Sequence, residues 1–150
     1  MEMHRWAARV PGTLSAPTNR ACYDLVVQAE TLALSELDEP LNISAVCSAL
    51  AVSERTLRKA FLKVHGIPPC RHLRMLRLSE ARRALLSADG QLVTVTEIAT
   101  GFGFVELGRF SVEYRRVYGE SPSKTLHRAS LDRLVVKGAA DDRSGLPFGM

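Results

Sequence analysis

A chain of 150 residues, 46% of them hydrophobic and 6% aromatic, is long enough for one domain or two small ones. The net charge of +4 is unevenly distributed: residues 1–53 hold 3 Lys/Arg against 6 Asp/Glu, residues 54–128 hold 14 against 7, and residues 129–150 hold 3 of each. The cationic middle segment favours a polyanionic partner. No run approaches about 18 apolar residues and no signal-peptide core is present, which argues against a membrane span or secretion and favours the cytoplasm.

The cysteines predict neither a disulfide framework nor a metal site. Cys22, Cys47 and Cys70 lie far apart, their number is odd, and no Cys/His pair has zinc-ligand spacing. We therefore expect reduced thiols, no metal and no cofactor.

The first half of the sequence predicts three helices after a segment, residues 1–18, without hydrophobic periodicity. The predicted helices cover about 19–37, 43–50 and 52–66. Ser53 is a suitable N-cap for the third helix, and Gly66 suits its C-terminal end.

The third helix has two different faces. At about 100° per residue, its apolar side chains fall on one side, while Arg55, Arg58 and Lys59 form one cluster on the opposite side. A short helix, a tight turn and a helix with a basic outer face are typical of a helix-turn-helix DNA reader. A helical hairpin with a solvated basic face would give the same pattern.

The second half predicts four more helices. A long helix is expected over residues 69–87, a short one opens at a Thr94/Glu97 capping box, the next covers 106–118, and the last begins at Pro122 and ends near Arg128. We predict four segments: a loose N-terminal segment over 1–18, a first subdomain with the connecting helix over 19–87, a second subdomain over 88–128, and a flexible tail over 129–150.

An internal repeat strengthens this interpretation. It pairs Leu57 with Phe110, Phe61 with Tyr114, and Gly66 with Gly119, at a separation of 53 residues. We therefore predict an all-α fold of about seven helices, in which two helix-turn-helix subdomains are joined by a long helix. The four paired apolar and aromatic side chains should be buried.

At this point the sequence resembles the DNA-binding domain of the AraC/XylS family of bacterial transcription regulators, over roughly residues 41–128. The second unit carries the most specific matches: Glu97-Ile98-Ala99, Gly103-Phe104, Phe110, Tyr114, Tyr118-Gly119 and Ser121-Pro122. The first unit and the connecting helix add Ser53, Leu57, Phe61, Gly66, Arg77 and Ala81. The sequence departs from the family at Ala51, where Gly is usual, and at Glu106, where a Ser, Asp or Asn cap is usual.

The resemblance implies a sequence-specific regulator, usually an activator that contacts RNA polymerase, whose two recognition helices enter the major groove of double-stranded DNA about 34 Å apart. Carried over by position, the base contacts are Arg55, Arg58, Lys59, Arg109, Ser111 and Val112. The phosphate contacts are Ser44, Lys63, Thr94, Thr96, Arg115, Arg116 and Lys124. No effector domain is evident in the forty residues that precede Leu41, although the family usually has one.

Two alternatives remain open. Cys70 begins a helix beside Arg71, where a thiol could be reactive, and the family's fold also occurs joined to alkyl-transfer repair domains. Because no substrate-pocket domain surrounds Cys70 in the sequence, we do not expect an enzyme. The other alternative is a helical protein-interaction module that uses the first helix.

Overall fold

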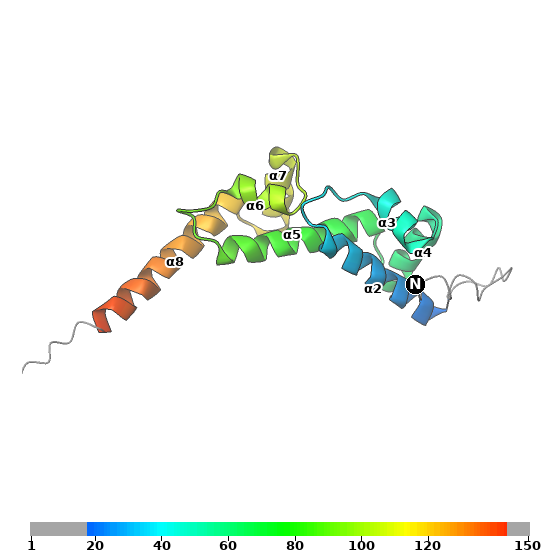
Figure 1. The fold of residues 1–150 in the computed structure, drawn as a ribbon, viewed down its shortest axis with the longest axis horizontal. Coiled ribbons are helices and arrows are strands. Elements are labelled where there is room, and N and C mark those ends of the chain that lie inside the picture. The colour runs from blue at the N-terminus through cyan, green and yellow to red at the C-terminus, as the bar shows by residue number, and fades with distance from the viewer. Residues whose placement is uncertain (1–17, 144–150) are drawn as a thin grey trace, which may run out of the picture. The chain divides into compact units, whose positions relative to one another are not determined.

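The computed structural model describes residues 18–143, which form seven helices and no strand (Figure 1), in agreement with the predicted all-α fold. Predictions for residues 1–17 and 144–150 lie outside the described residues. The helices are α2 (Asn19–Ser35), α3 (Ile43–Leu50), α4 (Glu54–His65), α5 (Pro69–Ser87), α6 (Val95–Gly101), α7 (Leu107–Tyr118) and α8 (Pro122–Arg143).

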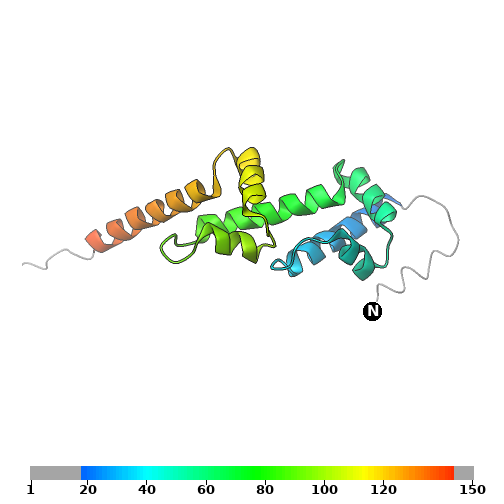
Figure 2. The ribbon, with the colours of Figure 1, turned by 90° about the horizontal axis from the view of Figure 1, so that it is seen from above.

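The chain divides into two compact units within α5, because unit 1 ends at Arg77 and unit 2 begins at Leu78. The sequence-based boundary, after residue 87, assigns all of α5 to the first subdomain. In the structure, Leu73 packs into the core of unit 1, whereas Leu78 and Leu85 pack into the core of unit 2. Figure 2 shows each half of α5 beside the other helices of its own unit.

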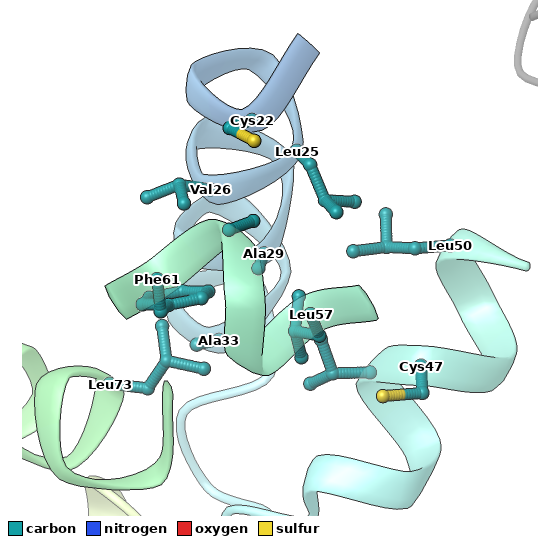
Figure 3. Packing of buried hydrophobic residues seen from close by; sticks show 12 residues of the cluster. Cys22, Leu25, Val26, Ala29, Ala33, Cys47, Leu50, Leu57, Phe61 and Leu73 are labelled. Carbon is teal, nitrogen blue, oxygen red and sulfur yellow. The ribbon is translucent and has the colours of Figure 1, made fainter. Parts of the chain in front are cut away.

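The core of unit 1 is formed where α4 packs against α2 and α3. Leu57 and Phe61 of α4 are fully buried, as the repeat predicts. Figure 3 shows Leu57 and Phe61 among buried side chains of α2 and α3, with Leu73 of α5 beside Phe61. This packing determines which face of α4 remains outside.

The core of unit 2 repeats the arrangement with α7 in place of α4. Phe110 and Tyr114 of α7 are fully buried among side chains of α5, α6 and α8, which confirms the other half of the repeat. Phe104 packs against Phe110 with its ring centroid 4.8 Å away.

The ends of α4 and α7 match as well. Both helices have 12 residues and are followed by a glycine in the left-handed conformation, Gly66 at φ 72° and Gly119 at φ 74°. The Gly66 N–H donates to Leu62 O and the Gly119 N–H donates to Arg115 O, which satisfies a carbonyl at each helix end. Glycine adopts this conformation without the steric cost that a Cβ atom brings.

Arg77 holds the end of α2 against α5. Its buried guanidinium donates to Ala33 O and Glu36 O, each at 3.0 Å, and to Glu39 O. These carbonyls lie in the last turn of α2 and in the segment that follows it. One side chain therefore satisfies three acceptors that the helix itself leaves unpaired.

The turn between α3 and α4 contains a strained alanine. Ala51 is the one non-glycine residue with positive φ among the described residues, at 54°. Its N–H donates to Ser48 O, and the Val52 N–H donates to Cys47 O at 3.0 Å, so the turn is hydrogen-bonded despite the missing glycine. The left-handed region costs an L-residue roughly 1–2 kcal/mol.

Replacing Ala51 with Gly should raise the free energy of unfolding by about 0.5–1 kcal/mol, because relief of strain exceeds the entropy that glycine adds to the unfolded chain. Urea denaturation measures the change. Ala49→Gly is the matched control: Ala49 lies inside α3, where the same substitution should cost about 1 kcal/mol. Equal destabilisation by both variants would show that Ala51 is not strained.

The final helix is longer than predicted. The sequence predicts an end near Arg128 and a flexible tail over residues 129–150, but α8 continues to Arg143. Ala129 is buried, the Ser130 hydroxyl accepts from the Gly90 N–H at 2.9 Å, and Arg133 donates to Leu86 O at 3.1 Å. These contacts with the end of α5 and the loop after it hold the first turns beyond Arg128 in place.

A search of the described helices for a membrane-spanning segment finds none with the necessary length and apolar character.

Candidate nucleic-acid interface

The outer face of α4 carries the first candidate interface. Arg55, Arg58 and Lys59 are all exposed, on the side opposite the buried Leu57 and Phe61. Among the side chains of residues 18–140, none of the three cations has an ion pair or a side-chain hydrogen bond. Their N–H groups are therefore available to an external acceptor.

The start of α4 is fixed by two polar contacts. The Ser53 hydroxyl accepts from the Thr56 N–H at 3.1 Å, as expected for an N-cap. The Ser44 hydroxyl donates to the Glu54 carboxylate at 2.9 Å and so joins the first turns of α3 and α4. This second contact is not predictable from the sequence, because ten residues separate the two side chains.

The outer face of α7 is chemically different. Val112 is 68% exposed, and Ser111 is half-buried. Arg109 is exposed, but its Nε lies 3.3 Å from the Glu113 carboxylate on the next turn of the same helix. A base contact by Arg109 must therefore compete with an existing ion pair, whereas the cations of α4 have no such competitor.

The start of α7 lacks the side-chain cap that is usual in the family, as Glu106 in the sequence indicates. Glu106 is the N-cap residue, and its side chain makes no capping hydrogen bond. Gly108 follows in the first turn, where an added Cβ would meet nothing within 4 Å. Both residues weaken the start of this helix relative to a Ser or Asp cap and an alanine.

A network of polar side chains holds the other end of α7. The buried Tyr114 hydroxyl donates to Thr125 Oγ1 at 2.8 Å, and Thr125 donates to the Glu120 carboxylate at 2.7 Å. Arg128 donates to the same carboxylate at 2.8 Å, and the Arg82 guanidinium lies 4.4 Å from the ring centre of Tyr118. Residues of α5, α7 and α8 thus meet around Tyr114.

The pKa values in this network follow from burial and hydrogen bonding. Burial raises the pKa of Tyr114, which keeps its hydroxyl protonated and able to donate. The hydrogen bond from Thr125 lowers the pKa of Glu120, and the charges of Arg128 and Arg82 act in the same direction. The network therefore pairs a neutral phenol with an ionised carboxylate near neutral pH.

Two of the predicted phosphate contacts have hydroxyls that already serve other acceptors. Ser44 donates to Glu54, and the Thr94 hydroxyl donates to Glu97 Oε2 at 2.9 Å. The Thr94 N–H also donates to that carboxylate, at 2.7 Å, and this bond lowers the pKa of Glu97. Neither hydroxyl is therefore available to donate to a phosphate oxygen.

The other predicted phosphate contacts are exposed. Lys63 lies in the last turn of α4, Arg115 and Arg116 in the last turn of α7, and Lys124 in the first turn of α8. Thr96 is exposed in α6. In unit 2, three of the predicted phosphate contacts, all of them cations, thus follow the buried Tyr114 along the chain.

Cys70, the candidate nucleophile, is exposed in the first turn of α5. It lines neither of two cavities, of about 540 and 820 Å³, in the described part of the chain.

Comparisons with known proteins agree with this geometry. A family model described as a helix-turn-helix domain matches residues 46–128, which include α4, α5, α6 and α7. A probable thc operon regulatory protein of Rhodococcus erythropolis is 41% identical over 88 residues, which are 59% of this chain and 26% of that protein. The xylDLEGF operon transcriptional activator 2 of Pseudomonas putida is 29% identical over 127 residues, 80% of this chain and 79% of that protein.

Two solved structures share the fold. One is a probable AraC family transcriptional regulator from Rhodopseudomonas palustris, which is 35% identical in sequence. Its TM-score is 0.61, and the match covers 71% of this chain and 97% of that one. The other is the DNA-binding domain of AdpA in complex with a target DNA, 25% identical with a TM-score of 0.63 over 72% of this chain and 95% of that one. The chain thus covers nearly all of each solved domain, but about a quarter of the thc regulator.

Proposed function

Because the chain belongs to the AraC/XylS family of helix-turn-helix regulators, we propose that it binds a specific site on double-stranded DNA and regulates transcription from there. The carrying observation is the repeat, once in each unit, of a 12-residue helix that buries one apolar face and carries exposed arginines outside it. Such a helix fits the major groove. The proposed site of action is the bacterial cytoplasm.

The proposed roles of the two recognition helices are unequal. Arg55, Arg58 and Lys59 present unpaired donors that suit guanine O6 and N7, so α4 reads bases. On α7, Arg109 is paired with Glu113, and Val112 offers only a methyl contact to thymine. We therefore assign α7 mainly to phosphates and DNA shape, with Arg109, Ser111 and Val112 as weaker base contacts.

The proposed phosphate contacts come chiefly from side-chain cations. Lys63 serves this role beside α4, and Arg115, Arg116 and Lys124 serve it in unit 2. Each is exposed, and a guanidinium or ammonium group is attracted to phosphate without regard to base sequence. Ser44, Thr94 and Thr96 contribute through the N–H groups of their helix starts, because Ser44 and Thr94 donate their hydroxyls to carboxylates.

We propose that the protein activates transcription and that RNA polymerase is its second partner. The supporting observation is the name of the Pseudomonas putida relative. The match spans 79% of that protein, which is named a transcriptional activator. The role is one of binding rather than catalysis, and the exposed Cys70 takes no part in it.

DNA binding should show a steep dependence on salt. Each phosphate contact contributes a slope of about 0.9 in log K against log salt, so Arg115→Ala should flatten the slope by about one unit. Fluorescence anisotropy on a duplex selected from a random pool measures this. Arg20→Ala, an exposed arginine on α2 outside the proposed interface, is the control and should leave the slope unchanged. A wild-type protein without any salt slope would contradict DNA binding and favour a protein-interaction module.

A further inference from the structure

A cluster of two histidines and one carboxylate lies in unit 1, away from the outer face of α4. Glu30 of α2, His65 of α4 and His72 of α5 bring their ligand atoms within 4.8 Å of one another. Glu30 Oε1 lies 3.1 Å from His65 Nε2 and 2.7 Å from His72 Nε2, so both rings converge on one oxygen.

The donor set has the composition of a transition-metal site. Two imidazoles with one carboxylate form a ligand set that occurs in zinc and non-haem iron proteins, with further coordination positions left to water. Metal–ligand bonds of about 2.0–2.1 Å place the donors of a tetrahedral ion about 3.3 Å apart. The distances of 3.1 and 2.7 Å therefore need to widen by about 0.2 and 0.6 Å.

The surroundings of the three side chains also suit a bound metal ion. The fully buried Phe61 lies beneath both imidazoles, with ring centroids 6.1 Å from His65 and 5.6 Å from His72, and forms an apolar wall. The side chains of His65, Glu30 and His72 are 32%, 26% and 16% exposed, so an ion can enter from solvent. The two imidazoles are stacked, with centroids 3.9 Å apart and planes 13° apart. The more exposed His65 can turn to open this stack around an ion.

We propose that Glu30, His65 and His72 bind one divalent transition-metal ion, with Zn²⁺ as the best match to the ligands. The ion takes the place of the direct contacts that the two Nε2 atoms now make with the carboxylate oxygen. It links three helices of unit 1 at the C-terminal end of α4 and so stabilises the helix that carries Arg55, Arg58 and Lys59. This inference goes beyond DNA binding and does not depend on it.

The direct test is titration of the full chain, freed of metal by a chelator, with Co²⁺ as a coloured substitute for Zn²⁺. We expect visible d–d absorption that saturates at one ion per chain, disappears when Zn²⁺ is added, and includes no thiolate charge-transfer band from Cys70. At a hundredfold excess over Kd, Zn²⁺ should also raise Tm by at least about 5 °C, while Mg²⁺ should not.

Three variants decide the ligand set. His65→Asn and Glu30→Gln should each weaken Co²⁺ binding by at least about 100-fold. Removing a residue that only hydrogen-bonds to a metal ligand lowers affinity by about 10–100-fold, and removing the ligand itself should cost more. His127→Asn, an exposed histidine on α8, is the matched control and should bind as the wild type does. If Glu30→Gln fails to fold, the exposed His65→Asn still gives the answer.

The proposal fails if Co²⁺ produces no visible absorption, or if the absorption persists in His65→Asn. A thiolate band, or equal loss in His127→Asn, would place the ion elsewhere and overturn it too. None of these results bears on DNA binding, which the salt slope measures separately.

Discussion

Replacing Phe61 with Ala should lower the free energy of unfolding of unit 1 by about 3–5 kcal/mol, from lost transfer energy and the cavity left behind. Phe61 has no exposed surface, and Figure 3 shows it in the core with Ala33 of α2 and Leu73 of α5 nearby. It also forms the wall behind His65 and His72. Since a small unit has few such side chains, the loss approaches the stability of a typical small domain.

Urea denaturation followed by circular dichroism measures the effect. The control is Leu62→Ala, because Leu62 is the next residue in α4 but is 42% exposed. Removing it should cost much less, since most surface substitutions stay within about 0.5 kcal/mol. If Phe61→Ala were as stable as Leu62→Ala, the buried and exposed faces of α4 would be misassigned, and with them the cationic interface.

The second large effect is expected at Arg77. Arg77→Met should lower the free energy of unfolding by about 2–4 kcal/mol, because it leaves the carbonyls of Ala33, Glu36 and Glu39 without their charged donor. Methionine keeps much of the side-chain volume, so the loss reports hydrogen bonding rather than a cavity. Burial lowers the pKa of Arg77, against the opposing charges of Asp38 and Glu36, but a guanidinium stays protonated near neutral pH.

Arg77→Lys should recover only part of this loss. An ammonium group is a single point donor and cannot reach three carbonyls with the planar fork of a guanidinium. Arg71→Met is the control, because Arg71 is exposed on the same helix. Equal stability of the Arg71 and Arg77 variants would mean that the end of α2 does not depend on Arg77.

The sequence predicts the helices best where local signals mark both ends. The predicted ranges of α3 and α5 agree with the structure, because Asn42 caps α3 and a proline begins α5. The repeat likewise predicts the burial of Phe61 and Phe110, because core positions follow the 3.6-residue period of a helix.

Contacts between distant segments are not predictable in this way. The resemblance singles out Arg77, but nothing in the local sequence relates it to the carbonyl of Ala33, 44 residues earlier. Glu30, His65 and His72 come from three helices, and no local spacing relates them. The same limit applies to α8, where Gly138 and the acidic residues after it suggest a tail, although contacts with the end of α5 support the helix.

In the proposed mode of binding, α4 reads bases and α7 chiefly contacts the DNA backbone. The most direct test is a base-by-base substitution scan of the selected duplex, measured for the wild type, Arg58→Ala and Arg115→Ala at one salt concentration.

We expect the wild type to show its sharpest preferences under α4. Arg58→Ala should lose about 1–3 kcal/mol of binding free energy and relax the preference at one or two base pairs. Arg115→Ala should weaken binding to all sequences alike. If the sharpest preferences lay under α7 instead, or if Arg58→Ala left every preference unchanged, the roles of the two helices would be the reverse of those assigned here.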